Sequence, residues 1–94
     1  MENSITIYTI IHAASSAENG MVICSTARGS YLSLAAARRE LKKQITAERK
    51  LIPEDYDCEE SGEDFWEVYQ DGFAAAAYSR LEIVPAMLYD ERMV

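Results

Sequence analysis

The chain has 94 residues, 49% of them hydrophobic and 27% charged, so we expect a single folded domain over residues 1–94. Sixteen acidic against nine basic residues give a net charge of -7. This charge argues against general nucleic-acid binding, which needs a positive field. The sequence has no apolar run of about 18 residues, and its start, MENS, lacks the basic region of a secretory signal. These features predict a cytoplasmic protein that does not span a membrane.

The charges are segregated along the chain. Residues 28–50 hold seven bases and two acids, whereas residues 51–79 hold nine acids and no Lys or Arg. Adjacent blocks of opposite sign can attract each other within one fold, dock two copies, or present an acidic surface to a basic partner. Attraction between the two blocks within one fold is favoured. The candidate basic helix face consists of Arg38, Arg39, Lys42 and Lys43, and the candidate acidic surface consists of Glu54, Asp55, Asp57, Glu59, Glu60, Glu63 and Asp64.

The first half of the chain begins with a predicted β-hairpin. Residues 5–14 are rich in β-branched side chains, residues 21–26 form a second short apolar run, and Asn19-Gly20 between them is a turn signal. Residues 27–30 interrupt this pattern. Alternation along the first strand divides its side chains between two faces. Ile5, Ile7 and Ile11 are predicted to enter the core, and Tyr8, Ile10 and His12 to point to the opposite face.

A helix is predicted next, ending near Leu51 because Pro53 forbids its continuation. Ser30 or Ser33 can cap its start, since a serine hydroxyl accepts a hydrogen bond from an otherwise unpaired N–H. The apolar stripe that identifies the helix recurs at spacings of three and four residues. Its members are Leu34, Ala37, Leu41 and Ile45.

The second half predicts an acidic loop followed by another hairpin. Residues 54–64 show no periodicity, whereas residues 65–70 have β character and are followed by the turn signal Asp71-Gly72. Residues 73–84 are ambiguous, because four alanines favour a helix and the later alternation favours a strand. A strand is preferred, since residues 65–70 need a partner. Pro85 should end it, with one short helical turn over residues 86–91.

The predicted fold is therefore a two-layer α+β domain of order β-β-α-β-β. One main helix covers one face of a four-stranded antiparallel sheet, and a short helical turn lies at the C-terminus. Leu81 and Ile83, with Phe65 or Trp66, are the expected contributions of the second hairpin to the core.

No residue pattern indicates catalysis, a metal or a cofactor. His12 is the only histidine. A catalytic relay of Ser15, His12 and an acid could be assembled, but the sequence has no G-x-S-x-G pattern around a nucleophilic serine. Cys24 lies in an apolar run, Cys58 lies among acids that disfavour its thiolate, and one His with two distant Cys does not form a zinc motif. The acids around Asp55 lack the glycine of a calcium loop. We expect no enzyme activity, no metal and no cofactor.

The leading hypothesis is a small interaction protein of bacterial type that forms homodimers through the uncovered face of its sheet. The candidate surface is Tyr8, Ile10, His12, Tyr78, Arg80 and Glu82. A second hypothesis is an inhibitor, encoded by a phage or mobile element, whose carboxylates imitate nucleic-acid phosphates. A third is a metal-assisted enzyme that uses the acids of residues 55–64. Membrane binding is not expected, and nucleic-acid binding is disfavoured.

Overall fold

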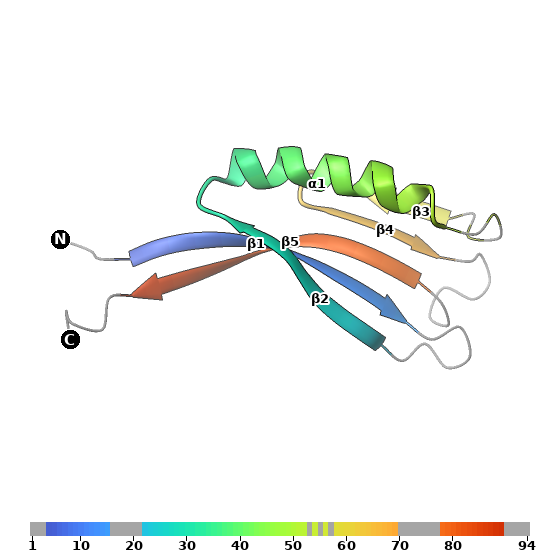
Figure 1. Cartoon of the computed structure of the whole chain (residues 1–94), viewed down its shortest axis with the longest axis horizontal. Coiled ribbons are helices and arrows are strands. Elements are labelled where there is room, and N and C mark those ends of the chain that lie inside the picture. The colour runs from blue at the N-terminus through green and yellow to red at the C-terminus, as the bar shows by residue number, and fades with distance from the viewer. Residues whose placement is uncertain are drawn as a thin grey trace.

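The computed structural model describes residues 4–15, 22–52, 54, 56, 58–69 and 78–89. The elements are β1 (Ser4–Ser15), β2 (Val22–Tyr31), α1 (Leu34–Arg49), β3 (Cys58–Ser61), β4 (Phe65–Tyr69) and β5 (Tyr78–Tyr89). The strands form one antiparallel sheet in the order β2-β1-β5-β4-β3. α1 lies over one face of this sheet (Figure 1). The predicted α+β class is confirmed, but the sheet has five strands rather than four.

The predicted helix is confirmed as α1. The Ser33 hydroxyl accepts a hydrogen bond from the N–H of Ala36 at 3.2 Å, so Ser33 is the capping serine. The helix ends at Arg49, two residues before the predicted Leu51. The predicted stripe faces the sheet, with Ala37 and Leu41 buried and Leu34 and Ile45 packed partly buried beside them.

The first hairpin is confirmed by the pairing of β1 with β2, although its predicted turn at residues 19–20 lies outside the described residues. The predicted interruption at residues 27–30 is wrong, because β2 continues through them. The register shifts between Thr9 and Ile11, which makes a β-bulge. Gly29 at this bulge has a φ of 115°, a conformation that favours glycine. The sequence signal for a break therefore marks an irregularity within a longer strand.

The fifth strand comes from the acidic segment, which was predicted as a loop. Residues 58–61 form β3 and pair with β4 at the edge of the sheet. Glu59 in β3 receives hydrogen bonds from Arg49 of α1 and from the indole of Trp66. These contacts from α1 and β4 stabilise a strand that local propensity does not favour.

The strand predicted over residues 73–84 is confirmed for residues 78–84, while residues 70–77, with the predicted turn Asp71-Gly72, lie outside the described residues. The predicted end at Pro85 and the helical turn after it are wrong, because β5 continues to Tyr89. The N–H of Ile83 donates to the carbonyl of Asp64 at 2.8 Å, away from β1. The backbone nitrogen of Pro85, two residues on, points to the same side of β5 as that of Ile83. This side faces away from β1 and lies beyond the end of β4, so the proline removes no hydrogen bond to β1.

The core lies between α1 and the centre of the sheet. Trp66, Leu81 and Ile83 are buried, as predicted for the second hairpin. The buried apolar residues are Ile10, Ala37, Leu41, Trp66, Val68, Leu81 and Ile83.

The predicted facing of β1 is wrong. Ile10 is fully buried beneath α1, His12 is 8% exposed, and Tyr8 packs against the core, whereas Ile5, predicted as core, is 55% exposed. Both rows of side chains along this strand are largely apolar, so alternation alone cannot choose the buried one. The pairing chooses it, because Ile10 stands beside Ile83 of β5.

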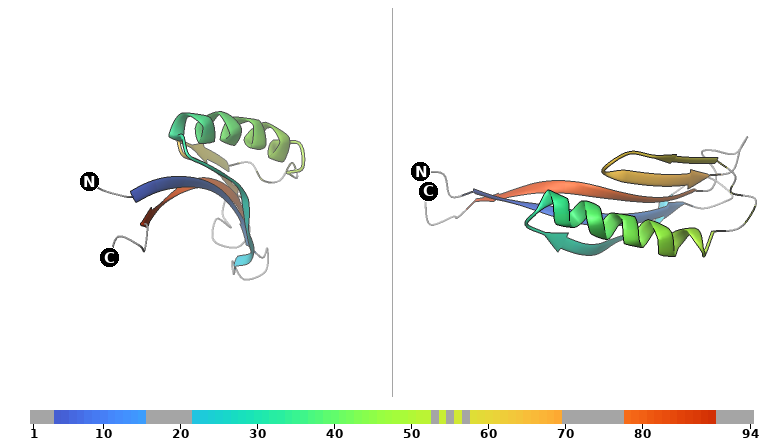
Figure 2. Two further views of the ribbon diagram at one scale, coloured as in Figure 1. Left: turned by 60° about the vertical axis from the view of Figure 1, so that its left-hand side comes forward. Right: turned by 90° about the horizontal axis from the view of Figure 1, so that it is seen from above.

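β1 and β5 project together beyond the other strands as a two-stranded ribbon (Figures 1 and 2). Pairing of β1 with β2 ends at Tyr8, and pairing of β5 with β4 ends at Glu82. Among the described residues, residues 4–7 therefore pair only with residues 86–89. We call these eight residues the terminal ribbon.

Candidate functional site

The predicted interaction surface is divided between the two faces of the sheet. Tyr8, Ile10 and His12 lie on the face covered by α1, so their predicted place on an open face is wrong. Arg80 and Glu82 alternate with the buried Leu81 and therefore point to the other face. The side chain of Tyr78, the remaining member of the predicted surface, lies outside the described part.

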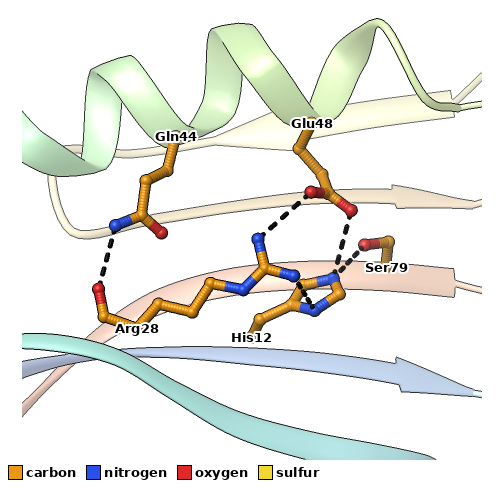
Figure 3. Close-up of polar contacts among 5 residues, drawn as sticks. All are labelled: His12, Arg28, Gln44, Glu48 and Ser79. Atoms are coloured by element: carbon orange, nitrogen blue, oxygen red, sulfur yellow. Dashed lines mark hydrogen bonds and ion pairs between the residues drawn. The ribbon is translucent and has the colours of Figure 1, made fainter.

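On the covered face, a polar cluster joins the C-terminal half of α1 to three strands (Figure 3). His12 Nε2 lies 2.8 Å from Ser79 Oγ and 3.3 Å from Glu48 Oε1. Arg28 lies 3.3 Å from the other carboxylate oxygen of Glu48 and 3.0 Å from His12 Nδ1. Gln44 donates to the carbonyl of Arg28 at the β-bulge at 3.0 Å. The polar cluster thus ties β1, β2 and β5 to the helix.

These contacts determine the protonation state of His12. A guanidinium group only donates hydrogen bonds, so Nδ1 of His12 must accept from Arg28 and its proton must lie on Nε2. That N–H points to the oxygens of Ser79 and Glu48. Burial, and then the positive charge of Arg28, lower the pKa of His12 below its ordinary value, and Glu48 opposes this shift. His12 is therefore neutral at pH 7.

The same geometry differs from that of a Ser-His-acid relay. In such a relay the imidazole accepts the serine proton at one nitrogen while its other nitrogen donates to the carboxylate. Here Ser79 and Glu48 share one nitrogen of His12, and the other faces a cation. Ser79, His12 and Glu48 differ from the predicted combination of Ser15, His12 and an acid, and their arrangement gives hydrogen-bond partners to buried polar groups. Gln44 is the exception in the cluster, because its Oε1 is buried without a hydrogen-bond partner among the described residues.

We expect the stability of the protein to fall as the pH decreases below about 6.5, toward the lowered pKa of folded His12. The unfolded chain takes up this proton near the ordinary pKa, whereas the folded protein resists protonation until a lower pH. The unfolded state therefore binds more protons in this interval, and the stability present above it is lost as the pH passes the folded pKa. Urea denaturation across this range measures the loss. The His12→Gln variant should lack this part of the slope, and an unchanged slope would contradict the assignment.

Ion pairs connect the basic helix to the acidic segment. Arg38 lies 3.2 Å from Glu63 and 2.7 Å from Asp64, and Arg49 forms two hydrogen bonds of 2.8 and 2.9 Å with Glu59. The bonds from Arg49 and from the Trp66 indole hold the pKa of Glu59 below its ordinary value. The helix and the β3–β4 hairpin are thus joined within one chain, the arrangement that charge segregation favours.

The other predicted charged residues stay at the surface. Glu54, Arg39 and Lys42 are exposed, and Lys43 lies 3.9 Å from Glu40 of the same helix. Glu60 accepts a hydrogen bond from the Tyr69 hydroxyl at 3.4 Å. Asp55 and Asp57 lie outside the described residues. Lys42 is one of the residues lining an open groove of about 350 Å³ between α1 and the β3–β4 hairpin; the lining residues are Lys42, Ile45, Thr46, Arg49, Ser61 and Gly62.

The opposite face of the sheet is the uncovered sheet face, because no described element lies over it (Figure 2). On one side of it Arg80 lies between Glu67 and Glu82, at 2.8 and 3.4 Å, and stacks 5.0 Å from the centre of the Phe65 ring. The charges there are paired within the chain. Its other part is mainly apolar and half-buried or exposed: Ile7, Thr9, Ile11 and Ala13 of β1, and Val84 of β5.

No family model, curated protein or solved structure matches the chain, so the geometry alone guides a functional interpretation. Within the described ranges, no three His, Cys, Asp or Glu side chains come together in a way that could hold a metal ion. None of the helices in that part of the chain is long and apolar enough to cross a bilayer.

Proposed function

We propose that the protein is a small, non-catalytic interaction module that self-associates through the uncovered sheet face. The observation that carries this proposal is the row of Ile7, Thr9, Ile11 and Ala13 on β1, apolar except for Thr9 and extended by Val84 on β5, which is 40% exposed. Burial of apolar surface stabilises association by about 25 cal/mol per Å². A second copy supplies an identical apolar row, as a two-fold symmetric interface requires.

The edges of the sheet disfavour pairing of their strands with those of another copy, so two copies are expected to pack with their sheets face to face. The outer strand β2 carries a bulge, and the opposite outer strand, β3, has four residues including Glu59 and Glu60. β5 beyond Glu82 contains Pro85, which cannot donate a backbone hydrogen bond. Bulges, short charged strands and prolines all discourage strand addition at an edge.

Two observations favour this proposal over its rivals. The carboxylates of Glu59, Glu63 and Asp64 bind arginines of α1, whereas a nucleic-acid mimic needs its carboxylates turned outward. The proton on Nε2 of His12 prevents that nitrogen from accepting the proton of Ser79, which a serine nucleophile would require. We therefore place the function on the surface of the sheet.

Sedimentation velocity over a concentration series tests the proposal. The wild-type chain should form dimers, and Ile11→Arg should raise the dimer dissociation constant by at least about 30-fold because it places a charge at the interface centre. Residue 11 stands opposite Glu82, so the monomer can accept the arginine. Leu51→Arg is the matched control, because Leu51 is 74% exposed at the far end of α1 and should leave the dimer unchanged. A wild-type chain that remains monomeric at all concentrations would contradict the proposal.

A further inference from the structure

The terminal ribbon exposes apolar surface in an unusual position for a folded domain. An isolated two-stranded ribbon is at best marginally stable in water. This one nevertheless carries Ile5 and Met87 on opposite faces, 55% and 54% exposed. They point to opposite faces because Met87 pairs with Thr6, the neighbour of Ile5. The ribbon therefore has apolar surface that no other described part of the chain covers.

The ribbon also lacks charge in a strongly acidic chain. Residues 4–11 and 83–89 contain no Asp, Glu, Lys or Arg, although 27% of the whole chain is charged. The net charge of -7 repels a second copy over most of the surface, but this repulsion is weakest where charged side chains are absent. Depletion of charged residues is also typical of the centre of a protein interface. Both arguments favour a second copy of this chain as the partner that covers the apolar surface of the ribbon.

One face of the ribbon continues the uncovered sheet face. Ile5 and Ile7 belong to the same row of β1 as Ile11, and Ala86 stands beside Ile7. The face with Met87 instead continues toward α1, whose side of the sheet is already covered. The Ile5 face is therefore the one available to a copy packed on the uncovered sheet face.

The area of the uncovered sheet face supports a role for the terminal ribbon in the interface. Strands β1, β2, β4 and β5 have 12, 10, 5 and 12 residues. At about 3.3 Å per residue and about 4.8 Å between strands, these strands span a projected area of roughly 600 Å². Specific interfaces bury at least about 600 Å² per partner, and the ribbon supplies roughly 130 Å² of this face. The ribbon thus makes up roughly a fifth of the projected area of this face.

We propose that the terminal ribbon of each copy packs, through the face that carries Ile5 and Ile7, against the uncovered sheet face of a second copy. The inference rests on the proposed function and identifies the part of the partner that the ribbon contacts. A two-fold axis perpendicular to β1 lays the ribbon of one copy over the wider part of the other copy's sheet, where β2 and β4 flank β1 and β5, and the reverse. Both contacts then form at once, so the dimer is closed and covers the Ile5 face of both ribbons.

A pair of substitutions on opposite faces of the ribbon tests the inference. Ile5→Arg should raise the dimer dissociation constant at least about 30-fold, since both copies place the charge in the contact. Met87→Arg, at an almost equally exposed position on the other face, should change it less than about threefold. Far-UV circular dichroism confirms that both variants fold. Sedimentation velocity at matched concentrations gives the dissociation constants.

The outcomes separate the inference from the proposed function. If Ile11→Arg dissociates the dimer and Ile5→Arg does not, the ribbon contact is overturned while self-association through the sheet face stands. If Met87→Arg is as disruptive as Ile5→Arg, the assignment of the ribbon face is wrong. If the wild-type chain is monomeric and instead sediments with phosphatidylcholine vesicles, both the ribbon contact and self-association are overturned.

Discussion

Replacing Trp66 with alanine is expected to lower the free energy of unfolding by about 3–5 kcal/mol, the usual cost of removing a buried tryptophan. Trp66 is fully buried in β4, and its neighbour across the strands is Leu81, which is also fully buried. Its indole N–H donates to Glu59 at 2.9 Å, and Glu59 binds Arg49 of the helix. The substitution therefore leaves a cavity and also weakens the attachment of β3.

Domains of this size have a total stability of about 5–14 kcal/mol, so the change should be visible as a large shift of the urea midpoint. Far-UV circular dichroism is the appropriate signal, because Trp66 is the only tryptophan. Trp66→Phe is the matched control: it keeps most of the buried ring, loses the bond to Glu59, and should cost less than the alanine variant. Equal costs for both variants would contradict a cavity as the main cause.

The elements that local chemistry defines could be predicted from the sequence. Ser33, the apolar stripe from Leu34 to Ile45, and Pro53 bracket one helix, and the structure places α1 within those limits. The two hairpins follow from β-branched and aromatic runs on either side of turn signals. In each case neighbouring residues carry the signal, so no knowledge of distant contacts is needed.

The facing of β1 and the formation of the extra strand depend on contacts between different elements of the fold. Tyr8 and Ile10 alternate with Ile7 and Ile11, so either row could be buried, and pairing with β5 decides between them. β3 has weak strand propensity and is stabilised by Arg49 and Trp66. Sequence periodicity contains neither of these contacts.

One feature of the sequence indicates the polar cluster. Glu48 follows Leu41 by seven residues and so extends the buried stripe of the helix with a carboxylate. A charged residue at that position predicts a buried partner. The identity of the partners could not be predicted, because Arg28 is 20 residues before Glu48 in the chain and Ser79 is 67 residues from His12.

Glu48→Leu is expected to lower the free energy of unfolding by about 3 kcal/mol, the lower end of the cost of breaking a buried ion pair from one side. The Glu48 side chain is only 11% exposed, and its removal leaves Arg28 and the N–H of His12 without their carboxylate. The lower end applies because Arg28 is 37% exposed and water can solvate part of its charge.

A second substitution distinguishes the cost of losing the Arg28–Glu48 ion pair from the cost of leaving Arg28 unpaired. In Glu48→Leu/Arg28→Leu no unpaired charge remains between these positions, so the double variant should recover part of the stability that Glu48→Leu loses. Glu40→Leu is the control on the same helix, because Glu40 contacts only the exposed Lys43 at 3.9 Å among the described residues and should change stability by about 0.5 kcal/mol or less. Urea denaturation of the four proteins at pH 7.5 gives the values. A double variant less stable than Glu48→Leu would show that the guanidinium of Arg28 stabilises the fold through His12 rather than through Glu48, since His12 Nδ1 is its other contact.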